Sequence, residues 1–242
     1  MARGAPDYSN VKSEQAIYTL LDLGELAARL GSIDRYDRSG NLVWADDFEA
    51  PTLNWLPDVA GTGSSVTLST AYRLMGWQSC LLTCGSDDGM GATIARYLSV
   101  PNVSPYSFEV ALYPDAHITV IVMWMYHVIN GVMHRWGIRY DATTDQLSYY
   151  NSAGGITVFA SSVTMLPLMG IFQLCKLTVD LRTGEYKQFR LNNTVYSLAG
   201  VPGFSIADPI SDYLRVSIEV FGTAAFNALC YVDNALVKQN EP

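Results

Sequence analysis

The sequence has little charge and very little lysine. Charged residues make up 16% of the 242 positions, below the roughly 25% of an average soluble domain. The 23 acidic residues exceed the 15 basic ones, giving a net charge of −8. The chain therefore lacks the basic surface that binding to nucleic-acid phosphates requires, and we expect no nucleic-acid partner. The low charge also favours a surface that is partly buried in an assembly.

Long apolar runs and paired cysteine motifs are also missing. The most apolar run, residues 118 to 129, contains Thr119 and His127 and is shorter than the roughly 18 residues of a membrane span, so we expect no membrane partner. The first residues show no apolar segment of a secretory signal, which predicts that the protein is made in the cytoplasm of a host cell and is not secreted. The cysteines form no C-x-x-C pair and are predicted to be free thiols in strands. They are Cys80, Cys84, Cys175 and Cys230.

The first forty residues differ from the rest of the chain. Residues 1 to 12 are rich in turn formers and predict an extended arm. Residues 14 to 30 follow the spacing of an amphipathic helix, with Gly31 as its stop. The apolar stripe of this helix consists of Ile17, Leu20, Leu21, Leu26 and Leu30. We expect residues 1 to 40 to anchor the chain to a neighbouring subunit and residues 41 to 242 to form a separate domain.

From residue 41 onward, short β-rich runs alternate with turn residues about every ten positions, which is typical of an antiparallel sandwich or barrel. The expected strands are 41–49, 64–70, 72–83, 92–99, 106–113, 117–129, 132–140, 146–151, 155–160, 171–181, 185–191, 194–198, 212–221 and 227–237. Several prolines fall between these runs, where the missing N–H costs no ladder bond.

One hairpin can be placed in register from the sequence. Asn130 and Gly131 form the strongest two-residue hairpin signal, because a type I′ turn needs positive φ at both positions. One face of the resulting hairpin is apolar and is expected in the core. The other face carries an aromatic and arginine patch, which favours a binding surface or a covered interface. This patch pairs Trp124 with Gly137 and Tyr126 with Arg135, and it also includes Arg139.

Three segments resemble the concanavalin A-like jelly roll of legume lectins, laminin-G-like domains and laminarinase-type glycosidases. Residues 44–49, Trp-Ala-Asp-Asp-Phe-Glu, are similar to the "DDFE" of the first strand in many such domains. Residues 176–193 resemble a pair of strands joined at Thr-Gly, and residues 228–237 are similar to the last strand. The resemblance implies an all-β fold, a two-sheet antiparallel jelly-roll sandwich, in agreement with the strand spacing.

The sequence lacks the carboxylate pair of the glycosidases in this superfamily. Those enzymes need an acid and a nucleophile about 5 Å apart, and the resemblance implies an E-x-D-x-x-E motif that is not present. The pair Asp87 and Asp88 and the acidic residues of the first strand have a different spacing. We therefore expect a protein that is not an enzyme.

Calcium is the one metal that the resemblance suggests. First and last strands of a jelly roll are commonly neighbours, which implies a calcium site from Asp46 or Asp47 together with Asp233. The alternative is that Asp46 and Asp47 cap the start of a strand and that Asp233 faces solvent. His127 and His134 pair across the expected hairpin, but no third metal ligand is placed near them. We expect no other cofactor.

Two functions remain open. The arm, the low charge and the missing signal favour a phage virion protein, either a capsid decoration or a head or tail surface subunit. Its partners are then other shell proteins and copies of itself. The alternative is a carbohydrate-binding module whose groove is lined by the patch of Trp124, Tyr126, Arg135 and Arg139. Further aromatic residues that could stack on sugar rings are Trp55, Trp77, Tyr149 and Tyr150, although packing in the core or in an interface is the more frequent role of such residues.

Overall fold

The computed structural model describes residues 39–86, 91–100, 102–165, 170–208, 212–223 and 226–242. Within these ranges the chain is built from strands, and no helix is long and apolar enough to cross a membrane. Residues Gly40–Pro242 form one compact unit. The expected arm and the helix stripe from Ile17 to Leu30 lie outside the described residues, so both stay predictions.

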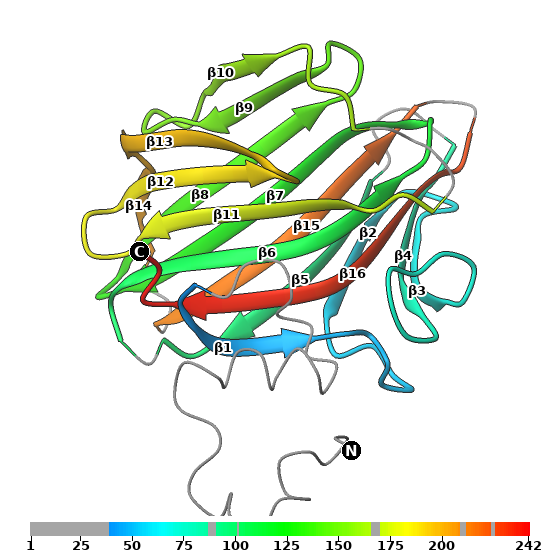
Figure 1. Cartoon of the computed structure of the whole chain (residues 1–242), viewed down its shortest axis with the longest axis horizontal. Helices are drawn as coiled ribbons and strands as arrows, with labels where there is room; N and C mark the ends of the chain where they lie inside the picture. Colours follow the sequence, from blue (N-terminus) through cyan, green and yellow to red (C-terminus); the bar gives the residue numbers. More distant parts are fainter. Residues whose placement is uncertain (1–38, 87–90, 101, 166–169, 209–211, 224–225) are drawn as a thin grey trace, which may run out of the picture. The chain divides into compact units, whose positions relative to one another are not determined.

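The strands form two antiparallel sheets of eight strands each. Sheet A runs in the order β13 (Thr194–Pro202), β12 (Glu185–Leu191), β11 (Gln173–Asp180), β6 (Pro105–Pro114), β16 (Ala228–Gln239), β4 (Ser79–Cys84) and β3 (Ser65–Ser69), and β1 (Asn41–Asp46) also pairs with β16. Sheet B runs β10 (Ile156–Ser161), β9 (Gln146–Tyr150), β8 (Val132–Asp141), β7 (Ile118–Ile129), β15 (Tyr213–Gly222), β5 (Gly91–Leu98) and β2 (Leu56–Ala60), and β14 (Phe204–Ala207) also pairs with β8. In Figure 1 the strands of sheet A cross in front of those of sheet B. The predicted all-β sandwich is confirmed.

The core lies between the sheets and fixes the backbone of sheet B from behind. Trp136 on β8 is fully buried, and its Nε1 donates to the carbonyl oxygen of Gly184 at 3.1 Å. Tyr186 on β12 crosses the core: its hydroxyl donates to the carbonyl oxygen of Tyr150 at 2.8 Å and accepts the N–H of Gly137 at 2.8 Å. These core side chains therefore fix the backbone of β8 and β9, whose outer faces carry the candidate site.

The hairpin of β7 and β8 has the predicted register. Asn130 has φ 51° and Gly131 has φ 74°, as a type I′ turn requires. Trp124 lies opposite Gly137, and Tyr126 lies opposite its predicted partner on β8. Since side chains alternate between the two faces of a strand, these residues share the outer face of sheet B.

The largest differences from the expected strands are two unpredicted strands and one strand that begins late. In addition, the first strand ends at Asp46 and β13 extends to Pro202. The strands β2 and β14 were not predicted, and each lies at a sheet edge. Both are short, and β2 contains a proline and an aspartate, residues that strands seldom contain. The expected strand over 72–83 begins only at Ser79, because the preceding residues form a loop.

Carboxylates hold this loop, residues 70–78, against sheet A. Asp233 Oδ2 accepts the backbone N–H groups of Leu74 and Met75 at 2.8 and 3.2 Å. Glu49 Oε1 accepts two further amides near the end of the loop, at 2.7 and 3.1 Å. Amides that a strand would donate to a neighbouring strand are thus donated to side chains, which explains why an alternating apolar pattern here does not form a strand.

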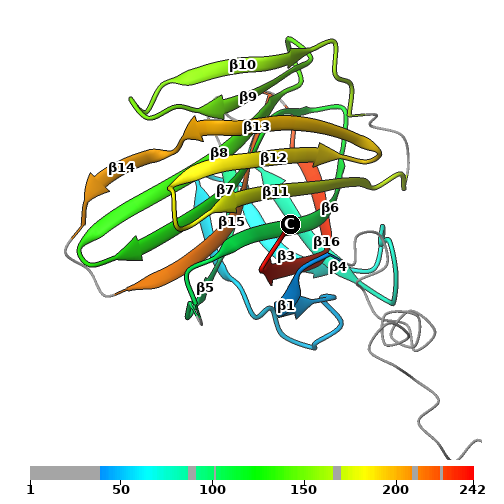
Figure 2. The ribbon, with the colours of Figure 1, turned by 60° about the vertical axis from the view of Figure 1, so that its left-hand side comes forward.

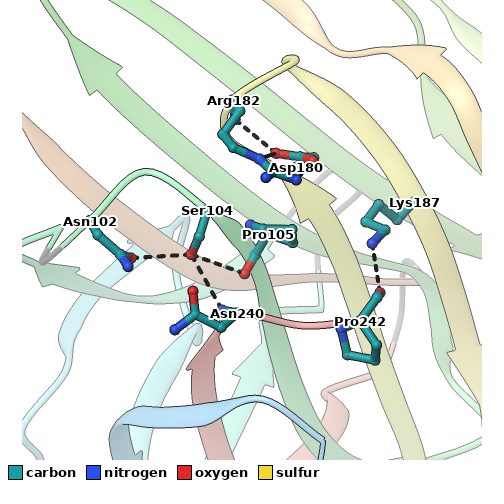
Figure 3. Close-up of polar contacts among 8 residues, drawn as sticks. All are labelled: Asn102, Ser104, Pro105, Asp180, Arg182, Lys187, Asn240 and Pro242. Atoms are coloured by element: carbon teal, nitrogen blue, oxygen red, sulfur yellow. Dashed lines mark hydrogen bonds and ion pairs between the residues drawn. The ribbon is translucent and has the colours of Figure 1, made fainter.

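The last residues of the chain are fastened to sheet A, as Figures 2 and 3 show. The Ser104 hydroxyl accepts the backbone N–H of Asn240 at 3.3 Å. Lys187 Nζ on β12 donates to the carbonyl oxygen of Pro242 at 2.6 Å. These contacts fix the C-terminal end of the chain beside β6 and β12.

The four cysteines are free thiols inside strands, as predicted. All four are buried in sheet A: Cys80 and Cys84 on β4, Cys175 on β11 and Cys230 on β16. They act as small apolar side chains of the core.

Candidate functional site

A row of alternating aromatic and arginine side chains crosses the outer face of sheet B. The strand registers place its members side by side on five neighbouring strands. In order, this arginine row consists of Tyr97 on β5, Arg215 on β15, Tyr126 on β7, Arg135 on β8 and Phe204 on β14. Period-2 alternation places them on one face because their strand neighbours Leu214, Met125 and Trp136 are buried in the core.

Each arginine of the row lies against aromatic rings. The guanidinium carbon of Arg215 is 4.9 Å from the ring centroid of Tyr126 and 5.7 Å from that of Tyr97. The guanidinium carbon of Arg135 is 4.2 Å from the ring centroid of Phe204. Cation–π contacts of this kind hold a guanidinium flat against an aromatic ring, and its N–H groups can still bind an anion.

Trp124 lies beside the row and supports it. A Cβ atom at Gly137 would come within 2.3 Å of the Trp124 ring, so the indole lies directly on the glycine. Trp124 Nε1 donates to Glu219 Oε2 at 3.1 Å, and the Tyr150 ring packs against the indole at 4.3 Å between centroids. Trp124 is only 6% exposed. It is thus a supporting side chain more than an open stacking platform.

The polar groups beside the row have opposite charges. Arg139 Nη2 pairs with Asp141 Oδ2 at 2.7 Å. Burial raises the pKa of Asp141, but hydrogen bonds from Thr143 and the charge of Arg139 outweigh this effect and lower the pKa below its usual value.

Within the row, burial raises the pKa of Tyr126 to about 12, although Arg215 opposes the change. Tyr126 therefore carries its proton at neutral pH and can donate a hydrogen bond.

We call the arginine row together with Trp124, Arg139, Tyr150 and Glu219 the aromatic–arginine face. It contains all four residues that the sequence predicted for a glycan groove or partner surface, and the structure brings them together. Sequence reasoning missed the four members on other strands, which are Tyr97 on β5, Phe204 on β14 and both Arg215 and Glu219 on β15. Arg215 and Glu219 come from a strand about ninety positions further along the chain. The alternation of polar side chains at Tyr213, Arg215, Ser217 and Glu219 with apolar ones was the signal that could have found them.

Other aromatic candidates for sugar stacking lie elsewhere. Trp55 is 3% exposed and packs against Trp44 and Phe48, so it belongs to the core, the alternative that the sequence favoured over sugar stacking. Tyr149 also packs against the core cluster. Trp77 is 78% exposed, but it lies on the loop of sheet A and not on the aromatic–arginine face.

The three carboxylates of the suggested calcium site accept hydrogen bonds from the protein. Asp46 Oδ1 accepts the N–H of Phe48 at 2.8 Å, and its Oδ2 accepts Trp55 Nε1 at 3.1 Å. Asp47 Oδ1 accepts a backbone N–H at 3.1 Å, and Asp233 binds the loop described above. The strands β1 and β16 are neighbours as expected. Yet within the described ranges no three acidic, histidine or cysteine side chains form a group that could hold a metal ion.

The two histidines of the hairpin pair as predicted. His127 is 2% exposed, and burial lowers its pKa. His134 Nδ1 lies 2.8 Å from the Ser205 hydroxyl, and burial lowers its pKa as well. Both therefore favour the neutral form. The acidic pair Asp87 and Asp88 lies outside the described residues.

The sequence matches no protein-family profile and no curated protein, but the fold is similar to solved structures. An endo-β-1,4-glucuronan lyase from Trichoderma reesei has a TM-score of 0.54 at 8% identity, over 83% of this chain and 96% of the lyase. A galectin-like protein of unknown function from Bacillus subtilis has a TM-score of 0.51 at 10% identity, over 84% and 97%. The Emp47p carbohydrate recognition domain has a TM-score of 0.49 at 12% identity, over 85% and 96%.

These similarities show that the fold is the concanavalin A-like and galectin-like jelly roll that the sequence resembles. They also correct one expectation. The prediction that the chain is not an enzyme was based on a missing glycosidase motif. It is wrong on that ground, because a lyase also has this fold. The absence of one glycosidase motif therefore does not exclude an enzyme, since the same fold holds both enzymes and binding proteins.

Proposed function

We propose that this protein binds carbohydrate on the aromatic–arginine face of sheet B. The observation that carries the proposal is the arginine row, in which aromatic rings and guanidinium groups alternate across five strands. Aromatic rings pack against the apolar faces of sugar rings, and the charged groups beside them bind hydroxyl and acidic substituents. A rigid sheet with a few directed polar groups is the arrangement that positions a ligand.

The surroundings of the row support this proposal. The Tyr126 hydroxyl is a donor at neutral pH, and Glu219 is fixed as an acceptor by the Trp124 indole. The fold is shared with a protein that acts on a glycan. The virion role and its assembly partners were predicted from the arm, the low charge and the missing secretory signal. Residues 1 to 38 lie outside the described part of the chain, so that role stays a separate proposal.

The test is a titration of the full-length protein against a panel of neutral and acidic oligosaccharides and polysaccharides, followed by calorimetry. We expect binding to at least one glycan, and Tyr126→Ala is expected to weaken it at least about tenfold, as for a central aromatic contact. Trp77→Ala is the matched control, because it removes an exposed aromatic side chain outside the face. Binding by no glycan, or equal loss in both variants, would contradict the proposal. The chain length of a bound polymer is measured in the same experiment. Shortening of the polymer by the unaltered protein, but not by the Tyr126→Ala variant, would show that the face is an active site.

A further inference from the structure

Two arginines of the face have no acidic partner. Arg139 is paired with Asp141, but Arg135 and Arg215 form no ion pair with a carboxylate of the described residues. The Nε atoms of both are buried without a hydrogen-bond partner, and so is the hydroxyl of Ser217, which lies on β15 opposite Trp124. Partly buried charges are ordinarily paired. The arginine row therefore holds two positive charges that form no ion pair with the described residues.

Aromatic contacts hold both guanidinium groups in place. Arg215 lies between Tyr97 and Tyr126, and Arg135 lies against Phe204. A guanidinium that stacks through its flat face keeps the N–H groups at its edge for hydrogen bonds in its own plane. That edge matches the two oxygens of a carboxylate.

The spacing of the two arginines fits a repeating ligand. They occupy β15 and β8, with β7 between them, so their backbones are two strand spacings or about 10 Å apart. Tyr126 lies between them in the same row. A chain of sugar units laid along the row would thus meet a positive charge, an aromatic ring and a second positive charge in turn.

We propose that the glycan bound by the aromatic–arginine face is acidic, with uronate carboxylates bound by Arg135 and Arg215 and a sugar ring packed on Tyr126. This inference rests on the proposed function and narrows its ligand class. Single-stranded nucleic acid also combines negative charge with rings that stack. A nucleic-acid site needs a broad basic patch along the phosphates, whereas the aromatic–arginine face holds only two arginines without an ion pair and also carries the acidic Glu219. A carboxylated glycan is therefore the ligand that the observations favour.

The experiment compares polyuronates with their own methyl esters. Full-length protein is titrated with polyglucuronate, polygalacturonate and polymannuronate, each as the free acid and as the ester, in which the sugar chain is unchanged and the charge is removed. We expect at least one free acid to bind about tenfold or more tightly than its ester. Arg135→Gln and Arg215→Gln should each remove most of this difference while leaving affinity for the ester within about twofold. Arg190→Gln, on β12 of sheet A, is the matched control.

Each alternative outcome is distinct. Equal affinity for acid and ester would overturn the acidic ligand and leave carbohydrate binding intact. If the protein bound a neutral glycan but none of the polyuronates, the acidic ligand would likewise be overturned and carbohydrate binding would remain. If it bound no glycan at all, both proposals would be contradicted. Tighter binding of an oligothymidylate than of any polyuronate would also overturn the inference. The thermal unfolding midpoint of each variant shows whether a loss of affinity comes from misfolding.

Discussion

Gly137 is the residue on which the Trp124 indole lies. An added Cβ would come within 2.3 Å of the Trp124 ring and 2.8 Å of the Tyr150 ring, and the backbone at Gly137 does not have a positive φ. We expect Gly137→Ala to leave the fold intact, at a cost of about 1 to 3 kcal/mol from overpacking. Glycan affinity should fall at least about tenfold, because both rings must move off the sheet.

Binding and thermal unfolding measured on the same preparation check this prediction. Gly155→Ala is the matched control, since its Cβ would make ordinary contacts no closer than 3.4 Å. If the Gly137 variant bound glycan like the unaltered protein, the ligand would not depend on the position of Trp124, and the site would have to lie elsewhere.

Asp233 is a buried carboxyl whose pKa is raised. Burial is the main cause and raises the pKa to about 6, although amides of Leu74, Met75 and Asn234 oppose it. The folded protein therefore binds this proton more tightly than the unfolded chain. Its contribution to the free energy of unfolding is fully present below the usual pKa of 3.8 and is lost as the pH rises through about 6.

We therefore expect the unaltered protein to gain stability relative to Asp233→Asn as the pH is lowered from about 7 to about 4, by at most about 3 kcal/mol. His127 and His134, whose pKa values are lowered, act in the opposite direction below their usual pKa. The variant carries both histidines, so their effect cancels in the comparison. Denaturant unfolding at several pH values measures the difference, and a difference that does not change with pH would contradict the assignment.

At the scale of elements, Glu241 links the residues after β16 to sheet A. Lys176 Nζ on β11 lies 2.9 Å from the Glu241 carboxylate, and both side chains are almost fully buried. The Ser107 hydroxyl donates to the same carboxylate at 2.6 Å. Removing one member of a buried ion pair leaves a buried charge with too few partners.

We expect Glu241→Ala to lower the free energy of unfolding by about 3 to 5 kcal/mol. Urea unfolding followed by fluorescence measures it. Pro242→Ala is the comparison, because the carbonyl oxygen that accepts from Lys187 is a backbone atom and remains. Equal stability of the alanine variant at Glu241 and the unaltered protein would show that the pair contributes nothing.

Local signals were enough for some elements and not for others. The turn at Asn130 and Gly131 determined a whole hairpin register, because turn geometry and side-chain alternation both act over neighbouring residues. The loop over 70–78 could not be predicted, since Asp233, more than 150 positions away, captures its amides. Half of the aromatic–arginine face was visible on the hairpin. The other half depends on which strands lie beside it, and that order comes from the whole fold.

At the scale of the whole molecule, the fold and the function are supported by different observations. The jelly roll is shared by a lyase and a galectin-like protein, so the sandwich alone does not distinguish catalysis from binding. The side chains on sheet B carry the proposed function. The sheets beneath them are a rigid support whose unfolding can be followed separately.

The buried thiols report on that support. Cys84 and Cys175 have pKa values raised to about 11 and about 12, chiefly by burial. The thiolate is the reactive form, so in the folded protein we expect slow reaction with a thiol reagent at about pH 8. All four thiols lie in the core of sheet A. If the sandwich opens as one unit, they should react with one common rate that rises with denaturant as global unfolding does. Mass spectrometry of partly labelled protein distinguishes this from local opening: the expected spectrum holds unlabelled and fully labelled molecules, and abundant singly labelled molecules would show that one strand opens separately.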